Sequence, residues 1–228
     1  MQARLESTTR FPPDWARIET VCLDMDGTVL DLRFDNLFWL EALPRAWGAS
    51  RGLTQREAWA ELKPRFDALR GTLEWYCVDH WSEELGFDVA GLKRRMSGHV
   101  RYLPGAVGFL HAVRATGRRL LLTTNAHPVS LDIKNRRTAL ADHFDELVSS
   151  HGYGAPKESS LFWQRLRDWH HVDLEKALFV DDSPAVLRAA REAGIAWLYQ
   201  LTWPDSTRPP VRPAAEFRGV RSLSELAP

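Results

Sequence analysis

The residues with the clearest chemical potential are two aspartates, Asp24 and Asp26, in the segment Asp24-Met25-Asp26-Gly27-Thr28. They directly follow residues 20–23, an apolar run typical of a buried strand. Carboxylates two residues apart can point the same way while the strand continues, and Gly27 permits a sharp turn after them. Such a pair repels unless a cation or a proton holds it. It could therefore supply a Mg²⁺ ligand and nucleophile at Asp24 and an acid/base partner at Asp26, or form only a polar Asp-Gly turn.

A second polar segment, Thr124-Asn125, closes the apolar run 119–123 just before a helical pattern begins. A hydroxyl there could hydrogen-bond a phosphate oxygen with help from backbone N–H groups. The same residue types also cap helices, so this segment alone does not decide between the two roles.

Lys157 and the pair Asp181-Asp182 stand in similar places. Lys157 lies between a predicted strand and a predicted helix, where its ammonium could bind a phosphate or simply face solvent. The acidic pair directly follows the apolar run 177–180. Adjacent acids repel without a cation, so their position favours a metal site over a turn.

The spacing of apolar residues predicts a parallel sheet that brings these segments together. Buried strands are expected at residues 20–23, 119–123, 146–149, 177–180 and 195–199. Helical patterns alternate with strands from residue 104 onward, an order that predicts right-handed crossovers. The carboxyl ends of parallel strands share one edge, where ligands bind. Several carboxylates, a lysine and a hydroxyl on that edge would form a site for a divalent cation and a phosphate.

The interval 31–100 breaks this alternation and predicts a separate helical unit. It contains no convincing strand and half of the chain's 10 tryptophans. Thr54 and Glu57 form a capping-box signature before apolar residues at helical spacing, and Pro64 should kink or split that helix.

We therefore expect an α/β protein with a Rossmann-like, three-layer α/β/α core and a helical cap inserted after the first strand. The core is assigned to residues 1–30 and 101–228, and the cap to residues 31–100. A Pro-rich surface loop at 203–213 and a short final element at 218–226 complete the core.

Composition narrows the class of protein. The chain of 228 residues has 30 basic and 30 acidic side chains, and this zero formal charge argues against a nucleic-acid partner. Its two cysteines, Cys22 and Cys77, cannot form a disulfide framework, and no CxxC or Cys/His ligand spacing occurs.

Residues 1–10 lack the apolar core of a signal peptide, and no apolar run approaches the ~18–20 residues of a membrane span. We expect a cytoplasmic protein without a membrane partner; oligomeric state cannot be read.

At these segments the sequence resembles the haloacid dehalogenase-like phosphatases. DMDGT at 24–28 matches their first motif, TTN at 123–125 their second, Pro156-Lys157 their third and VDDS at 180–183 their fourth. The order and the strand contexts agree over essentially the whole chain. Within the family, the stretches LDMDGTVLDLRFDNLFW, EWYCVDHWSEELG, TNAHP and FVDDSPAVL resemble bacterial GMP/IMP nucleotidases.

The resemblance implies a role for each aspartate of the first motif. Asp24 would attack phosphorus and carry the phosphoryl group. Asp26 would protonate the leaving alkoxide and then deprotonate the hydrolytic water, while its backbone carbonyl contacts Mg²⁺. Phosphoryl transfer also needs the developing charge to be neutralised, which Mg²⁺ and Lys157 would provide.

The other motifs would hold phosphate and metal. Thr124 and Lys157 would bind the phosphoryl oxygens, with Asn125 beside them. Asp182 would ligate Mg²⁺ directly, with Asp181 as a further ligand or as a neighbour of the ligands. Some family members carry another Asp four residues beyond the ligand, where this chain has Val186, and Asp181 is expected to replace it.

The implied substrate is a small phosphomonoester, with the purine 5′-mononucleotides GMP and IMP expected chiefly from the resemblance. A nucleobase suits an aromatic platform in the cap, although each aromatic could instead pack in the cap's own core. The candidate contacts are Phe34, Asn36, Trp39, Arg45, Trp47 and Trp75.

Three alternatives remain open at this stage. A sugar-phosphate phosphatase would use the same catalytic residues. A haloacid dehalogenase would use the Asp24 nucleophile but has no need of Asp26 or the acidic pair. A non-catalytic binding protein of the same fold should lack a catalytic residue, and none is missing.

Overall fold

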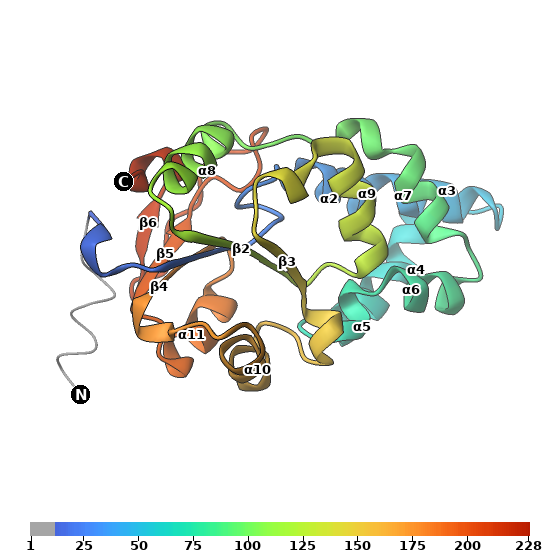
Figure 1. Cartoon of the computed structure of the whole chain (residues 1–228). Coiled ribbons are helices and arrows are strands. Elements are labelled where there is room, and N and C mark those ends of the chain that lie inside the picture. Colours follow the sequence, from blue (N-terminus) through green and yellow to red (C-terminus); the bar gives the residue numbers. More distant parts are fainter. Residues whose placement is uncertain (1–11) are drawn as a thin grey trace.

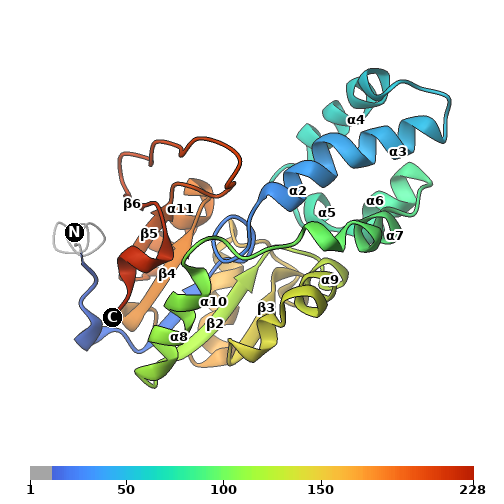
Figure 2. The ribbon, with the colours of Figure 1, turned by 90° about the horizontal axis from the view of Figure 1, so that it is seen from above.

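The computed structural model describes residues 12–228, which form a parallel sheet with helices on both faces and a helical lobe at one end (Figures 1 and 2). The expected lack of a signal peptide concerns residues 1–10, and with residue 11 these lie outside the described residues. No helix within residues 12–228 is long and apolar enough to cross a membrane.

Six strands form one sheet in the order β3-β2-β1-β4-β5-β6, with all neighbours parallel. Their bounds are β1 (Thr20–Leu23), β2 (Arg119–Thr124), β3 (Glu146–Ser149), β4 (Ala177–Asp181), β5 (Trp197–Leu201) and β6 (Arg218–Val220). The predicted α/β fold class is confirmed. The fifth strand begins two residues later than predicted because Ile195 and Ala196 still belong to the turn after Gly194, where their N–H groups bond to the carbonyls of Ala190 and Leu174.

The sheet is buried on both faces, as the continuous apolar runs predict. Along β1, Val21 and Leu23 face one hydrophobic cluster with α8 (Ala106–Ala115). Cys22 faces the opposite cluster with α10 (Ser160–His170) and α11 (Pro184–Ala193). Figure 1 shows α8 on one side of the strands and α10 and α11 on the other.

The interval between β1 and α8 contains helices joined by turns and forms a helical lobe, the cap, beyond the strands' carboxyl ends (Figure 2). Its elements are α2 (Arg33–Leu37), a π-helical turn (Phe38–Ala42), α3 (Leu43–Ala49), α4 (Gln55–Leu69), α5 (Leu73–Tyr76), α6 (Val78–Leu85) and α7 (Val89–Arg95). They enclose their own hydrophobic cluster, which includes Trp47, Phe66 and Trp81. The chain leaves and re-enters the sheet domain at adjacent points, where Leu30 forms an antiparallel bridge with Tyr102.

Helix α4 begins as predicted but does not break. Thr54 and Glu57 form the reciprocal capping box, with the Thr54 N–H donating to the Glu57 carboxylate at 2.8 Å. The expectation that Pro64 splits the helix is wrong, since α4 continues to Leu69. Pro64 lies on the exposed face, where water can satisfy the carbonyl that lacks its helical N–H partner, and the apolar face opposite keeps the helix packed.

The remaining helix of the core, α9 (Pro128–Thr138), follows β2 and packs against α7 of the lobe. The predicted loop over 203–213 is present, and the final segment docks as β6 followed by a 3₁₀ helix (Leu223–Leu226).

Two helical glycines offer a matched test of packing in the lobe. A methyl group at Gly48 of α3 would lie 2.8 Å from Ala58 Cβ, whereas one at Gly108 of α8 would meet nothing within 4 Å. We predict that Gly108→Ala raises the free energy of unfolding by about 0.5–1 kcal/mol. Gly48→Ala should lower it by about 1–3 kcal/mol through overpacking. Urea unfolding followed by circular dichroism measures both, and stabilisation by Gly48→Ala would contradict the close crossing of α3 and α4.

Candidate active site

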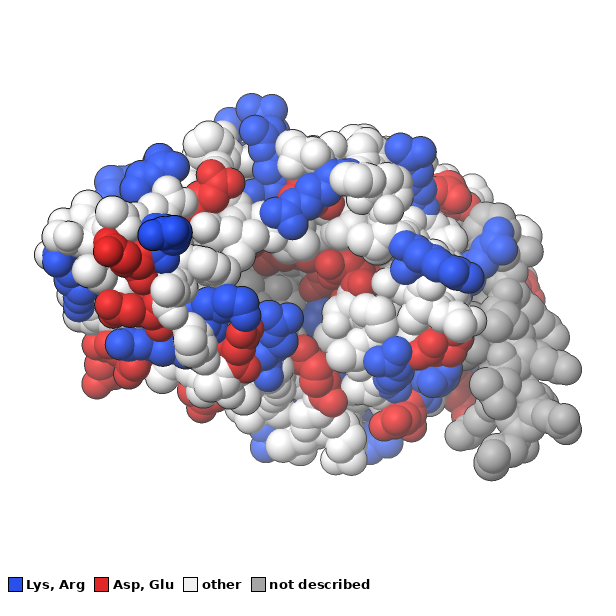
Figure 3. Space-filling view, turned by 180° about the vertical axis from the view of Figure 1, so that it is seen from behind, with Lys and Arg blue, Asp and Glu red and all other residues white. Residues whose placement is uncertain are grey.

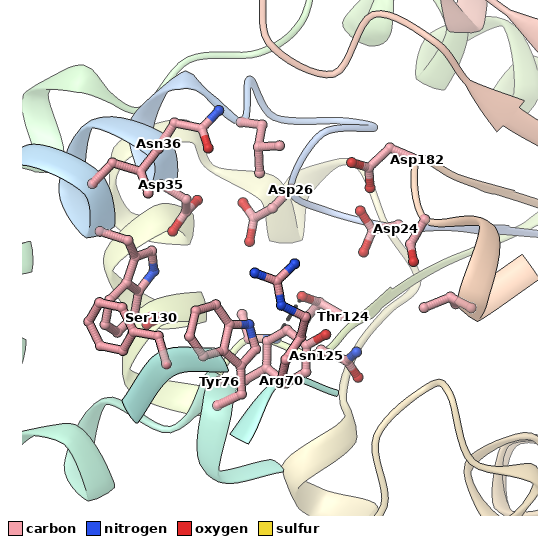
Figure 4. Close-up of a pocket in the computed structure, with 18 of the residues that line it drawn as sticks. Asp24, Asp26, Asp35, Asn36, Arg70, Tyr76, Thr124, Asn125, Ser130 and Asp182 are labelled. Atoms are coloured by element: carbon pink, nitrogen blue, oxygen red, sulfur yellow. Dashed lines mark hydrogen bonds between the residues drawn. The ribbon is translucent and has the colours of Figure 1, made fainter. Parts of the chain in front are cut away.

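The four polar segments converge at the carboxyl edge of the sheet. Side chains from all four line one cavity of about 390 Å³, which is roofed by the cap (Figure 4). These lining residues are Asp24, Asp26, Thr124, Asn125, Lys157, Asp181 and Asp182. In the space-filling view from behind, the surface is hollowed where acidic side chains gather, with basic side chains beside the hollow (Figure 3).

Lys157 connects two of these segments. Its ammonium donates to the carboxylates of Asp24 at 2.5 Å and Asp181 at 2.7 Å, and to the carbonyl of Thr123 at 3.1 Å. The side chain is only 2% exposed. Burial alone would lower the pKa of Lys157, but the charges of Asp181 and Asp24 raise it above its ordinary value. Lys157 therefore stays protonated and fixes the two carboxylates beside each other.

Asp24, Asp181 and Asp182 form an acidic cluster whose oxygen atoms lie within 4.8 Å of one another. Burial, opposed by Lys157, raises the pKa of Asp24 to about 7. Burial and the charges of Asp181 and Asp24 raise the pKa of Asp182 well above its ordinary value. Three carboxylates facing one ammonium leave uncompensated negative charge, which a cation would neutralise.

The donor chemistry of this cluster fits Mg²⁺, which prefers carboxylate oxygens. Asp181 is already engaged, because one oxygen accepts from Lys157 and the other from the backbone N–H of Ser183 at 2.8 Å. Asp24 and Asp182 share no such pair of contacts with side chains, so each can turn an oxygen atom toward a cation. Asp181 holds Lys157 in place beside them, and its own contact with a cation remains a prediction.

Gly27 allows the first loop to approach the acidic cluster. Its φ of +92° is a conformation that favours glycine, and a Cβ atom there would lie 2.8 Å from an Asp182 oxygen. No larger residue fits between this turn and Asp182.

Thr124 and Asn125 differ in whether their side chains keep a hydrogen-bonding group for a phosphate. The Thr124 hydroxyl accepts from the Ala126 N–H at 3.0 Å, which leaves its own proton available to a phosphate oxygen. Asn125 accepts from the Lys157 N–H at 2.8 Å and donates to Glu158 at 2.9 Å. Both ends of its amide are occupied, so Asn125 positions the backbone of Lys157, and its contact with phosphate remains a prediction.

Asp26 is held by residues that sequence reasoning missed. Its carboxylate pairs with Lys134 of α9 at 2.6 Å, and Lys134 also pairs with Asp35 of α2 at 2.7 Å. Asp35 is bound on its other oxygen by Lys93 of α7 at 2.8 Å. The two lysines are 1–3% exposed and the two carboxylates 13–20%, so the chain of alternating charges crosses the boundary between core and cap with buried lysines and partly exposed aspartates.

The chain of charges also sets the electrostatics around Asp26. Burial raises the pKa of Asp26 to about 7, with Asp35 and Asp24 adding to the rise and Lys134 opposing it. Burial would likewise raise the pKa of Asp35, but Lys134 and Lys93 lower it below its ordinary value. No local pattern marks Lys134, because a lysine in the polar segment PVSLDIKNRRT looks like part of a solvated helix face.

Half of the candidate leaving-group contacts line the cavity. Asn36, Trp39 and Trp75 do so, and the two indoles are stacked with centroids 6.1 Å apart. The Asn36 amide donates to Asp205 of the 203–213 loop at 2.7 Å. Further cap residues that were not anticipated also line it, namely Trp59, Lys63, Phe66, Asp67, Arg70 and Tyr76.

The other three candidates do not line the cavity, so the structure does not bring them to the site. Phe34 is buried in the main core cluster. Trp47 packs in the cap core, where its indole N–H donates to the Leu85 carbonyl at 3.1 Å. Arg45 lies on the exposed surface of α3. The alternative considered for cap aromatics, packing in the core, holds for Phe34 and Trp47.

The family model for haloacid dehalogenase-like hydrolases matches residues 18–194. The chain is 41% identical over 192 residues to the GMP/IMP nucleotidase YrfG of Escherichia coli (strain K12). The aligned residues cover 84% of this chain and 86% of that protein. The Shigella flexneri protein of the same name gives the same values.

Solved structures share the architecture at lower identity. An HAD phosphatase from Thermococcus onnurineus matches with a TM-score of 0.78 and 20% identity, covering 92% of this chain and 96% of that one. A putative beta-phosphoglucomutase from Thermotoga maritima matches at 0.67 and 22%, covering 92% and 97%. An L-2-haloacid dehalogenase from Xanthobacter autotrophicus matches at 0.63 and 18%, covering 92% and 97%. At these identities the likeness shows the fold alone.

The chain belongs to the haloacid dehalogenase-like hydrolase family. The resemblance to bacterial GMP/IMP nucleotidases is confirmed as sequence similarity, and the expected enzyme class, a phosphoric monoester hydrolase, is confirmed with it.

Proposed function

We propose that the protein is a Mg²⁺-dependent phosphatase that hydrolyses purine 5′-mononucleotides, GMP and IMP above all, through a phosphoryl group carried on Asp24. The observation that carries the proposal is the position of Asp24, which is buried beside Lys157 and the acidic pair at the floor of a cavity roofed by stacked indoles. The similarity to GMP/IMP nucleotidases, at 41% sequence identity, supports the choice of substrate.

In the proposed reaction, the free oxygen of Asp24 attacks phosphorus in line with the leaving 5′-oxygen. The Thr124 hydroxyl donates to an equatorial phosphoryl oxygen. The Lys157 ammonium exchanges one of its three present hydrogen bonds for a phosphoryl oxygen, and its charge neutralises the charge that develops there. A Mg²⁺ ion held by Asp24 and Asp182 would supply further charge neutralisation and fix the geometry of the phosphate.

Asp26 takes the role of proton donor and acceptor. It lines the same cavity two residues beyond the nucleophile, and Lys134 fixes one of its oxygens. It gives a proton to the leaving alkoxide and later takes one from the water that hydrolyses the phosphorylated Asp24. An enzyme that displaced halide would have no leaving alkoxide to protonate, so Asp26 favours phosphate over haloacid chemistry.

The cap supplies a platform for the leaving group. Trp39 and Trp75 both line the cavity, and stacking on an aromatic side chain is worth about 1–3 kcal/mol per base. The phosphate would lie at the sheet edge with the nucleobase among the cap aromatics. Cap closure would exclude water from the reacting phosphate.

A substrate panel tests the proposal directly. With Mg²⁺, we predict phosphate release from GMP and IMP at higher kcat/KM than from pyrimidine nucleotides or sugar phosphates. Asp24→Asn should lower kcat at least about a thousandfold because the nucleophile is lost. Chelation by EDTA should abolish activity and added Mg²⁺ restore it.

The matched control is Asp132→Asn, which removes a carboxylate from the exposed face of α9 and should leave the rate unchanged. Faster hydrolysis of sugar phosphates would overturn the substrate and leave the mechanism standing. Full activity of Asp24→Asn would overturn the mechanism itself.

A second prediction concerns Lys134 as a positioning residue for Asp26. Lys134→Met should lower kcat for GMP about a hundredfold, the lower end of what a general acid contributes, with a smaller change in KM. p-Nitrophenyl phosphate releases a stable anion that needs no proton. Its first-turnover burst of nitrophenolate, followed by stopped flow, should therefore be much less affected. This burst also reports that the variant is folded.

Asp26→Asn serves as the reference, since it should show the same contrast between the two substrates. If Lys134→Met slowed the GMP reaction and the nitrophenolate burst equally, Lys134 would act on folding or phosphate binding instead.

A further inference from the structure

A second cluster of metal-ligating side chains lies outside the catalytic cavity. One ligand atom each of Cys77, His127 and His151 lies within 4.8 Å of the other two, and none of the three residues lines the cavity. Cys77 stands between α5 and α6 of the cap. His127 precedes α9 and His151 lies in the 3₁₀ turn after β3, so both histidines belong to the core. The cluster therefore joins cap and core outside the residues that line the catalytic cavity.

The two imidazoles are suited to ligation because they lie against each other and are partly buried. Their ring centroids are 4.9 Å apart. Nε2 of His151 is buried and has no hydrogen-bond partner among residues 12–228. A metal-binding histidine needs one ring nitrogen free of competing partners, which this atom provides.

The third ligand is a sulfur at the start of a helix. The Cys77 Sγ atom accepts a hydrogen bond from the His80 N–H at 3.4 Å, and this N–H group would stabilise the negative charge of a metal-bound thiolate. Nδ1 of His127 has only a long contact of 3.4 Å with the Val129 N–H, and Nε2 lies 3.6 Å from Asp79 Oδ2. A metal bond to His127 would replace one of these contacts, and water can occupy the fourth position around the ion.

We propose that Cys77, His127 and His151 form a second metal site, which binds Zn²⁺ or a comparable transition metal and clamps the cap to the core. One thiolate and two imidazoles are donors that suit Zn²⁺ and not Mg²⁺. Cys77 moves with the cap while both histidines stay with the core, so a bound ion opposes opening of the cap. The site is independent of the proposed phosphatase activity.

Cobalt spectroscopy tests the site without reference to catalysis. The chain has two cysteines, and Cys22 is buried in β1 with a pKa raised by burial to about 12. Co²⁺ titrated into the full chain should produce a sulfur-to-cobalt charge-transfer band that saturates at one equivalent and disappears when Zn²⁺ is added. Co²⁺ at the aspartates of the catalytic cavity has only oxygen ligands and gives no such band.

Variants assign the band to its ligand. Cys77→Ser should abolish it, and serine can still cap α6, so the fold is retained. Cys22→Ala is the matched cysteine control and should keep the band. His151→Ala should weaken Co²⁺ binding by at least about tenfold, the smallest loss expected even for a residue that only supports a ligand. No band at saturating Co²⁺, or a band that survives Cys77→Ser, would overturn the site.

The clamp has its own readout. With Mg²⁺ saturating, one equivalent of Zn²⁺ should slow multiple turnover of the wild-type protein and of Cys22→Ala but not of Cys77→Ser. Equal inhibition of Cys77→Ser would contradict the clamp, because the inhibiting ion would then bind elsewhere. Should the protein prove inactive on every phosphomonoester, the cobalt band still decides the metal site.

Discussion

The structure depends on one buried interaction, the ammonium of Lys157 between the carboxylates of Asp24 and Asp181. Each carboxylate ends or follows a central strand, and the lysine comes from the turn before α10, so this contact ties three segments of the core to one point. An isolated charge so deeply buried would be costly, and the group of three is tolerable because each charge has an opposite partner. The negative charge left over on Asp24 and Asp182 is what makes the same point attractive to a cation and then to a phosphate.

A second set of buried charges extends this site into the cap. The cap has its own hydrophobic cluster and would be expected to move as a unit. A chain of ion pairs nevertheless links it to the core, running from Lys93 and Asp35 of the cap to Lys134 and Asp26 of the core. The orientation of the proposed proton donor is thus coupled to the position of the cap. Such coupling would let the acid be correctly placed only when the cap covers the site.

The sequence predicts what local patterns encode. The ends of the strands and the polar residues after them could be predicted, because an apolar run that stops at Asp24 or Asp181 is typical of a buried strand that ends at the edge of a sheet. Lys134 could not be found, since nothing in a polar helix reveals that its lysine faces two carboxylates from elsewhere. Trp47 and Trp75 are the same residue type, and both lie in short helical segments of the cap sequence. Only tertiary packing places Trp47 in the cap core and Trp75 at the cavity. The absence of a Cys/His ligand spacing likewise says nothing about Cys77, His127 and His151, which only folding brings together.

The central claim, that Asp24 carries the phosphoryl group, is tested most directly by the stereochemistry at phosphorus. Each in-line displacement inverts the configuration. A nucleoside 5′-phosphorothioate made chiral at phosphorus with two oxygen isotopes, and hydrolysed in water that carries the third isotope, should therefore give chiral thiophosphate with retained configuration, because transfer to Asp24 and then to water inverts it twice. Inverted thiophosphate would mean that water attacks the substrate directly, and Asp24 would then serve the metal or the water and not the phosphorus.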